Sequence, residues 1–215
     1  MAKIVPAILT DKPEELEAML RQAESFTSWA QLDVMDGAFV PSRSITAADI
    51  AHARPRLQWE VHLMVRDPAK YFDSFKKAGA QKVVFHYEAA ASNIEETVRR
   101  ARAHGLRVGL AVNPETPIST IQPLLGMVDG VLFLSVNPGF YGAPFIPEVL
   151  DKVKELRRFS PLMEIGIDGG IKESNVGLVA KAGADFICVG SAVFRHPDPG
   201  ESFRHLQSLA DHAAG

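Results

Sequence analysis

Eight short apolar segments recur along the chain at nearly even spacing, and each is followed by a polar turn. They are rich in Val, Ile, Leu and Phe, and their apolar residues are mostly continuous rather than alternating with polar ones. Runs of this kind are typical of strands that are buried on both faces, as in a parallel sheet. The predicted strands span residues 3–9, 30–34, 59–65, 82–87, 107–112, 130–136, 163–168 and 186–190.

Amphipathic segments lie between many of these strands and carry the signals of helix ends. The first has Pro13 with acidic residues beside it, which suits the first turn of a helix. Two others have basic residues shortly before a glycine, at Gly79 and Gly105, as at a helix C-terminus. The predicted helical segments span residues 11–25, 67–80, 92–105, 143–159, 173–184 and 199–213.

This alternation of strands and helices predicts a parallel sheet with crossover helices. Eight units in 215 residues favour one closed (β/α)8 TIM barrel, a single α/β domain over residues 1–215. The alternative is an open doubly wound sheet, which would more often carry a GxGxxG loop after its first strand. The sequence has no such loop there.

The bulk composition limits the function classes. A net charge of −3 gives no basic footprint for nucleic acid. No apolar run approaches the 18 residues of a membrane span, and the N-terminus lacks the pattern of a signal peptide. Cys188 is the only cysteine, so an intrachain disulfide is excluded and we expect a buried free thiol. We therefore expect a cytoplasmic protein with neither nucleic acid nor membrane as a partner.

Polar side chains gather where the predicted strands end. In a (β/α)8 barrel the chemistry lies at the C-terminal ends of the strands, so this clustering predicts an active site there. The residues concerned are Asp33, Asp36, His62, His86, Glu88, Asn113, Ser135, Asn137, Asp168 and Ser191.

Asp33 and Asp168 are the most informative of these residues. A buried ionised carboxylate is costly unless it is paired or bound to a metal. Two aspartates on different strands, with His62 between them, could bind a divalent cation or could act as a general acid and base. A single histidine in an apolar strand, such as His62 or His86, is more often a satisfied core residue. Asp36 precedes Gly37 and is typical of turn chemistry.

Three glycine-rich loops come late in the chain, at residues 137–142, 168–171 and 189–194. Glycine allows close approach of the backbone to a ligand, and loops after the seventh and eighth strands of such barrels often hold a phosphate. Simple turns are the alternative, but three such loops in consecutive units favour a phosphate site.

The motifs together resemble the ribulose-phosphate 3-epimerase family. They are "PAILT" (6–10), "DVMDGAFVP" (33–41), "VHLMV" (61–65), "FHYEA" (85–89), "VNPGFYG" (136–142), "DGGI" (168–171) and "VGSAVF" (189–194). Their order and positions match the family over almost the whole chain. The resemblance implies a barrel of the ribulose-phosphate-binding type and interconversion of D-ribulose 5-phosphate and D-xylulose 5-phosphate.

The resemblance also implies roles for individual residues. Asp33 and Asp168 match the two aspartates that move protons on opposite faces of C3, through an enediolate. The metal ligands would be Asp33, His62 and Asp168, with Gln31 as a weak additional ligand, and the cation would be Zn, Fe, Mn or Mg. The phosphate would be held by Gly142, Gly169, Gly170, Gly190 and Ser191. The substrate pocket would include Ala7, Gln31, Met35, Met64, His86 and Leu134.

Four positions depart from the family pattern. Gln31 stands where the family has a metal-binding histidine, Ala7 replaces a serine, Leu134 replaces a methionine, and Ala143 replaces a loop glutamine. A neutral amide oxygen is a poorer zinc ligand than an imidazole. The identity of the metal, and whether one binds, therefore depends on Gln31.

Two rival functions stay open on the sequence alone. A related isomerase, aldolase or decarboxylase would usually place a lysine beside the aspartate of the second or third strand, where this chain has none. A weakly catalytic phosphosugar-binding protein would have no need of two buried aspartates. The expected partner is in each case a small sugar phosphate. Homo-oligomers are common among such barrels, but no sequence feature sets a number of subunits.

Overall fold

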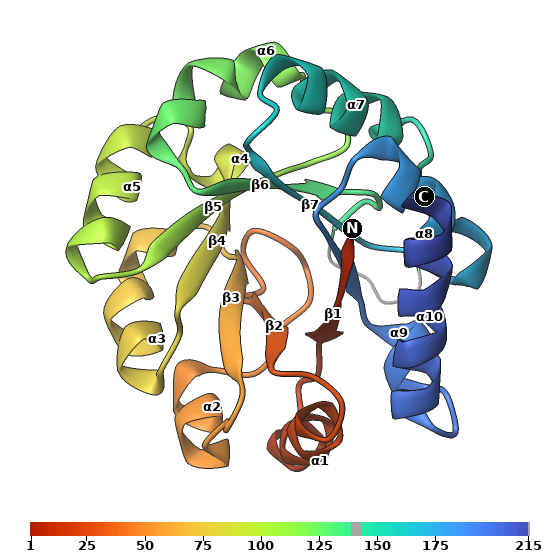
Figure 1. The fold of residues 1–215 in the computed structure, drawn as a ribbon. Helices are drawn as coiled ribbons and strands as arrows, with labels where there is room; N and C mark the ends of the chain where they lie inside the picture. The colour runs from red at the N-terminus through yellow and green to blue at the C-terminus, as the bar shows by residue number, and fades with distance from the viewer. Residues whose placement is uncertain (139–142, 215) are drawn as a thin grey trace.

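The computed structural model describes residues 1–138 and 143–214, and these form a closed barrel. Its strands pair in parallel in sequence order, and the eighth closes onto the first. Figure 1 shows the strands at the centre with the helices around them, which confirms the predicted (β/α)8 fold. The strands are β1 (Lys3–Ile8), β2 (Trp29–Met35), β3 (Gln58–Met64), β4 (Lys82–His86), β5 (Arg107–Val112), β6 (Gly130–Leu134), β7 (Glu164–Asp168) and β8 (Phe186–Val189).

Each predicted helical segment contains an observed helix, and further short helices appear where the sequence predicted none. The predicted strand at 82–87 ends at His86 because a helix begins at Tyr87. The α-helices are α1 (Pro13–Glu24), α2 (Ala47–Ala53), α3 (Phe72–Ala78), α4 (Tyr87–Ala90), α5 (Ile94–Ala103), α6 (Ile118–Ile121), α7 (Val149–Phe159), α8 (Glu173–Ala182), α9 (Ser191–Phe194) and α10 (Pro199–Ala214). Two 3₁₀ helices, η1 (Pro68–Lys70) and η2 (Gln122–Met127), complete the described elements.

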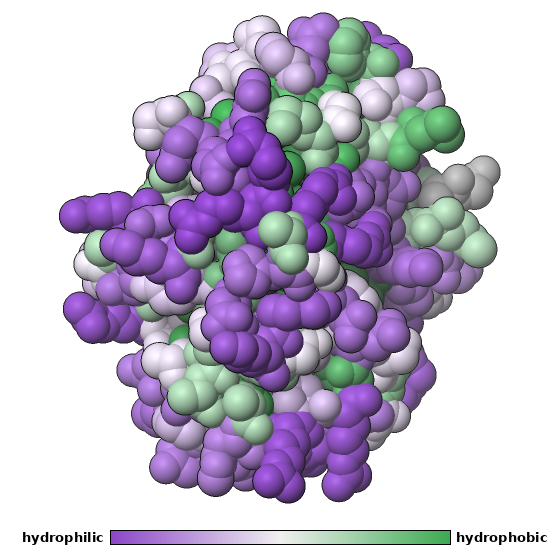
Figure 2. Space-filling view, turned by 90° about the vertical axis from the view of Figure 1, so that its left-hand side faces the viewer, coloured by the Kyte–Doolittle hydropathy of each residue, from purple (hydrophilic) through white to green (hydrophobic). Residues whose placement is uncertain are grey.

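The outward side chains of the strands form the main core with the surrounding helices. This arrangement buries both faces of the sheet, which is why the strands are continuously apolar in sequence. The face shown in Figure 2 is mainly hydrophilic, and its hydrophobic side chains occur in small separate groups. Within the described residues, no helix has the length and apolar character needed to cross a membrane.

A charged and aromatic cluster lies at the N-terminal end of the barrel interior. Lys82 is 2% exposed, and its Nζ lies 3.1 Å from Glu60 Oε2 and 2.5 Å from Glu164 Oε1. The same Nζ lies 4.8 Å from the centroid of the Phe186 ring. The Phe186 ring has room because its neighbour on β7 is a glycine. A Cβ on Gly166 would lie 2.1 Å from Phe186 Cζ.

We expect Gly166→Ala to destabilise the barrel by about 1–3 kcal/mol, because the new methyl group overpacks the interior against the Phe186 ring. Chemical denaturation measures the loss. The double variant Gly166→Ala/Phe186→Leu should be more stable than Gly166→Ala alone, because the shorter side chain frees the space. Equal stabilities of the two variants would contradict this explanation.

Candidate active site

A pocket opens at the C-terminal ends of the strands, as the sequence predicted for the active site. It brings together most of the predicted site residues from six different strands or the loops that follow them. Those lining it are Ala7, Asp33, Met35, Met64, Leu134, Asp168, Gly169, Gly170, Gly190 and Ser191. Gln31, His62 and His86 are fully buried and do not line the pocket.

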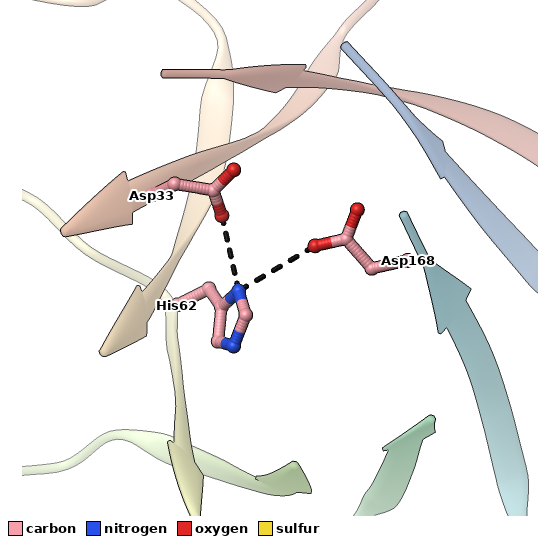
Figure 3. A group of neighbouring side chains, drawn as sticks. All are labelled: Asp33, His62 and Asp168. Atoms are coloured by element: carbon pink, nitrogen blue, oxygen red, sulfur yellow. Dashed lines mark hydrogen bonds and ion pairs between the residues drawn. The ribbon is translucent and has the colours of Figure 1, made fainter. Parts of the chain in front are cut away.

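Asp33, His62 and Asp168 meet beside this pocket, from β2, β3 and β7. Figure 3 shows the ring of His62 pointing its Nδ1 at both carboxylates. The Nδ1 atom lies 3.0 Å from Asp33 Oδ1 and 3.5 Å from Asp168 Oδ2. Asp33 and His62 are neighbours in the register of β2 and β3, so the sheet itself places these two side chains together.

Gln31 joins the same two carboxylates from within the barrel. Its Nε2 donates to Asp33 Oδ1 at 3.0 Å and to Asp168 Oδ2 at 2.9 Å. Its Oε1 accepts a hydrogen bond from Cys188 Sγ at 3.2 Å. The carboxamide is 0% exposed, so these three bonds take the place of any contact with water.

A chain of hydrogen bonds continues from His62 away from the pocket. His62 Nε2 lies 3.0 Å from His86 Nε2, and His86 Nδ1 lies 3.3 Å from Glu88 Oε2. The other oxygen of Glu88 accepts from the backbone N–H of Asn113 at 2.9 Å and from the hydroxyl of Thr116. One hydrogen must lie between the two facing Nε2 atoms, so when one of these nitrogens donates, the other accepts. His86 thus supports His62 rather than facing the pocket.

The electrostatics of Asp33, His62 and Asp168 favour a protonated imidazole between the two carboxyl groups. Burial and the charge of Asp168 raise the pKa of Asp33 to about 6, against the bonds from His62 and Gln31 that lower it. Burial lowers the pKa of His62, but its bonds to Asp168 and Asp33 and both carboxylate charges outweigh burial and raise that pKa to about 9. Two carboxylates close together cannot both be ionised cheaply, and the imidazolium compensates them.

These shifts predict a stability that falls with rising pH. His62 binds its proton more tightly in the folded chain, with a pKa of about 9 against the ordinary value of 6.5. Its contribution is fully present below about pH 6.5 and is lost as the pH rises toward 9. Asp33 acts in the same direction over the lower range, up to a pH of about 6.

We expect the metal-free protein to lose about 1–3 kcal/mol of unfolding free energy between pH 6.5 and 9. Urea denaturation in the presence of a chelator measures this slope. The His62→Gln variant should show a clearly flatter profile over that range, because it removes the group that titrates. An unchanged slope in the variant would contradict this assignment.

The residues present fit a divalent cation. One donor atom from each of Asp33, His62 and Asp168 lies within 4.8 Å of the others. Carboxylate and imidazole donors suit Zn²⁺ and related divalent metals, and three protein ligands leave a position for substrate or water. The contact of His62 Nε2 with His86 is the kind of outer contact that orients a metal-binding imidazole.

The glycine loops that follow β7 and β8 also line the pocket. Gly169 and Gly170 have φ of 109° and 66°, so the loop after β7 requires glycine for its conformation alone. A Cβ on Gly170 would also lie 2.9 Å from the Phe145 backbone. Gly190 precedes α9, whose first residue is Ser191. Gly142, also predicted to bind phosphate, lies outside the described residues.

Asp36 has the turn role predicted for it. Its Oδ1 accepts from the backbone N–H groups of Ala38 and Phe39, and its Oδ2 accepts from that of Arg66. Although partial burial raises its pKa, these backbone bonds lower it below the ordinary value. Asp36 therefore holds the loop after β2 rather than the group around Asp33.

Cys188 is the site residue whose place the sequence did not reveal. It is buried, as predicted, but its side chain lines the pocket and contacts Gln31. Burial and the nearby charges of Asp168 and Glu60 raise the pKa of its thiol well above the ordinary range, so the thiol stays protonated. The signal available in the sequence was its position near the C-terminal end of β8, two residues before Gly190 of the loop that follows.

Several solved structures share this fold at low sequence identity. A ligand-bound structure of KGPDC from Streptococcus mutans has a TM-score of 0.79 at 10% identity, covering 100% of this chain and 99% of that one. The 3-hexulose-6-phosphate synthase of Salmonella typhimurium has a TM-score of 0.75 at 17% identity, covering 98% and 99%. These likenesses are matches of fold.

Sequence comparisons identify the family. The model of the ribulose-phosphate 3-epimerase family matches residues 3–194. The chain is 37% identical to the cytoplasmic isoform of ribulose-phosphate 3-epimerase from Oryza sativa subsp. japonica, over 98% of this chain and 95% of that protein. It is 38% identical to the ribulose-phosphate 3-epimerase of Synechocystis sp., over 95% and 93%. Together with the site geometry, these matches show that the chain belongs to the ribulose-phosphate 3-epimerase family and is an isomerase.

Proposed function

We propose that this protein inverts C3 of a ketopentose 5-phosphate, interconverting D-ribulose 5-phosphate and D-xylulose 5-phosphate. One observation carries the proposal: Asp33 and Asp168 come from different strands, line the same pocket and are joined by one amide and one imidazole. Inversion at a carbon next to a carbonyl needs two proton-transfer groups on opposite sides of that carbon. Two aspartates on separate strands can supply them.

In the proposed reaction one aspartate removes the proton from C3 and the electron pair moves to the carbonyl oxygen, giving an enediolate. The other aspartate then delivers a proton to the opposite face, and the carbonyl is restored at C2. The pKa of Asp33, raised to about 6, supports this role because a general acid or base works best with a pKa near the working pH. His62 and Gln31 hold the two carboxylates in place.

Asp33, His62 and Asp168 would hold a divalent metal, for which Zn, Fe, Mn and Mg are all candidates. When bound, the cation supplies positive charge that offsets the charge developing on the substrate oxygens. Met35 and Met64 would cover the neighbouring wall of the pocket and keep water from the reacting carbons. The backbone of Gly169, Gly170 and Gly190, with Ser191, would bind the phosphate, and Gly142 is proposed with them.

Lysine chemistry is the main alternative within this type of barrel. Among the described residues that line the pocket there is no lysine, and Lys82 lies at the opposite end of the barrel in its ion pairs. The observation favours proton transfer by carboxylates. A cytoplasmic location is proposed by analogy with the rice isoform, whose name states it.

The experiment incubates the purified protein with D-ribulose 5-phosphate in D₂O and follows C3 by NMR. We expect deuterium at C3 together with xylulose 5-phosphate. No exchange and no product under any metal condition would overturn the proposed function. A ketohexose 6-phosphate in a parallel sample tests whether the preferred ketose phosphate is larger.

We expect chelation to reduce the rate of exchange at C3, because the site loses the positive charge that a bound cation would supply. The measurement compares enzyme treated exhaustively with chelator against the same enzyme after Zn²⁺, Mn²⁺, Fe²⁺ or Mg²⁺ is restored. Full activity after chelation would contradict the role of the metal while leaving that of the two aspartates intact.

A further inference from the structure

We propose that Cys188 and Gln31 form a positioning pair: the thiol fixes the carboxamide so that both of its N–H bonds hold the two aspartates, and Gln31 does not ligate the metal. The inference rests on the proposed function for its effect on catalysis, but its geometry stands without it. Its starting point is a carboxamide whose polar atoms are all used within the protein.

Gln31 has two amide hydrogens, and each has a different carboxylate as its acceptor. The bonds reach Asp33 Oδ1 at 3.0 Å and Asp168 Oδ2 at 2.9 Å, so the nitrogen lies between the two acids. An amide N–H bonded to a carboxylate is a charge-assisted hydrogen bond, stronger than a bond between neutral groups. The neutral amide thereby holds two mutually repelling carboxylates together without adding charge.

The thiol favours one of the two orientations of the carboxamide. Cys188 Sγ lies 3.2 Å from Gln31 Oε1, and a protonated thiol can donate there. If the carboxamide were reversed, its oxygen would face two carboxylate oxygens and its NH₂ group would face the thiol. Both ends of the carboxamide therefore select the same orientation, with the donors on the side of the aspartates.

The barrel brings the two residues together across an intervening strand. Gln31 is on β2 and Cys188 is on β8, and β1 pairs with both. The Cα partner of Gln31 on β1 is Ala7, and the Cα partner of Cys188 is Val5. Ala7 and Cys188 belong to the same buried cluster of the barrel interior.

The same geometry removes Gln31 from the metal ligands. Metals bind amides through the oxygen, and this oxygen faces Cys188 rather than the space among Asp33, His62 and Asp168. The donor set in that space is therefore two carboxylates and one imidazole. A cation entering it has to compete with the N–H groups of Gln31 for Asp33 Oδ1 and Asp168 Oδ2.

The first test measures metal binding without substrate. Mn²⁺ affinity is measured by electron paramagnetic resonance for the wild type, Gln31→Leu and Gln31→His. We expect Gln31→Leu to bind Mn²⁺ at least as tightly as the wild type, and Gln31→His to bind at least about tenfold more tightly because it adds a ligand. A loss of about tenfold or more in Gln31→Leu would show that Gln31 is a ligand and would overturn the proposal.

The second test separates the effect of the hydrogen-bond donor of Cys188 from the effect of its side-chain volume. Cys188→Ser keeps an O–H donor toward Gln31 Oε1, whereas Cys188→Ala removes the donor, and thermal unfolding checks that both are folded. In the metal-free protein, we expect the side-chain amide resonances of Gln31 to exchange with water faster in Cys188→Ala than in the wild type, and Cys188→Ser to restore slow exchange. Identical amide exchange in all three proteins would overturn the pair.

The third test uses the rate of C3 exchange. We expect Cys188→Ala to lower kcat about two- to tenfold with little change in KM, the size of effect given by one lost neutral hydrogen bond, and Cys188→Ser to recover most of it. A kcat in Cys188→Ala equal to that of the wild type would contradict the positioning role. If the wild type itself shows no exchange at C3, the proposed function fails. The measurements of metal affinity and amide exchange still test whether Cys188 and Gln31 form a positioning pair.

Discussion

Replacing Asp168 by asparagine is expected to lower the rate of C3 exchange by about 10²–10⁴-fold, the usual contribution of a general acid or base. Asparagine keeps the size and one oxygen of the side chain but cannot accept or deliver a proton at neutral pH. Asp33→Asn should give a loss of the same order, because inversion needs both groups. Incorporation of deuterium at C3 and formation of the epimer are measured together.

The matched control is Asp36→Asn, which removes a carboxylate three residues from Asp33. Asp36 accepts only backbone N–H groups among the contacts described for it, so its loss weakens a loop rather than the chemistry. We expect its activity to fall less than about tenfold, the size of one weakened set of local hydrogen bonds. Asp168→Asn with more than a tenth of the wild-type rate would argue against a two-aspartate reaction.

Replacing Lys82 by methionine is expected to cost about 3–5 kcal/mol of unfolding free energy. Lys82 is buried between Glu60 and Glu164, and Glu60 is 1% exposed. Without the ammonium group, a carboxylate would remain inside the barrel with no opposite charge. Urea denaturation at neutral pH measures the loss.

Arg107 provides the control for this prediction, because it pairs with the same Glu164 from the surface. The Arg107 Nη2 atom lies 3.2 Å from Glu164 Oε2, and the arginine side chain is 54% exposed. Arg107→Met should therefore cost no more than about 1 kcal/mol. The double variant Glu60→Gln/Lys82→Met should be more stable than Lys82→Met alone. Equal losses of unfolding free energy in Lys82→Met and Arg107→Met would contradict the role of Lys82 in a buried ion pair.

The fold was predictable because its main signal is local. Strands such as β4 are buried on both faces, so the apolar character of residues 83–85 is continuous and visible in the sequence. Helix α2 was not predicted, because it has only seven residues after an irregular loop; the capping box of Thr46 and Asp49 was the one local signal of its start. Such a short element owes its stability to tertiary packing rather than to sequence periodicity.

Most members of the candidate site were predictable, but the place of Cys188 and the hydrogen bonds between the members were not. Asp33, His62 and Asp168 could be named because polar residues at strand ends of a barrel meet at one face. The other end of the Gln31 carboxamide contacts Cys188, which is 157 positions away and on a strand that does not pair with β2. A contact across the barrel interior leaves no periodic signal in the chain.

Along the axis of this barrel, the buried residues that stabilise the fold lie at one end and the residues of the active site lie at the other. The charged and aromatic cluster around Lys82 and Phe186 secures one end, and none of its residues lines the active-site pocket. Gln31 and Ala7 lie toward the other end, so substitutions at these two positions leave the cluster around Lys82 and Phe186 unchanged. An enzyme built in this way can exchange the ligands and walls of its active site during evolution without first having to rebuild its fold.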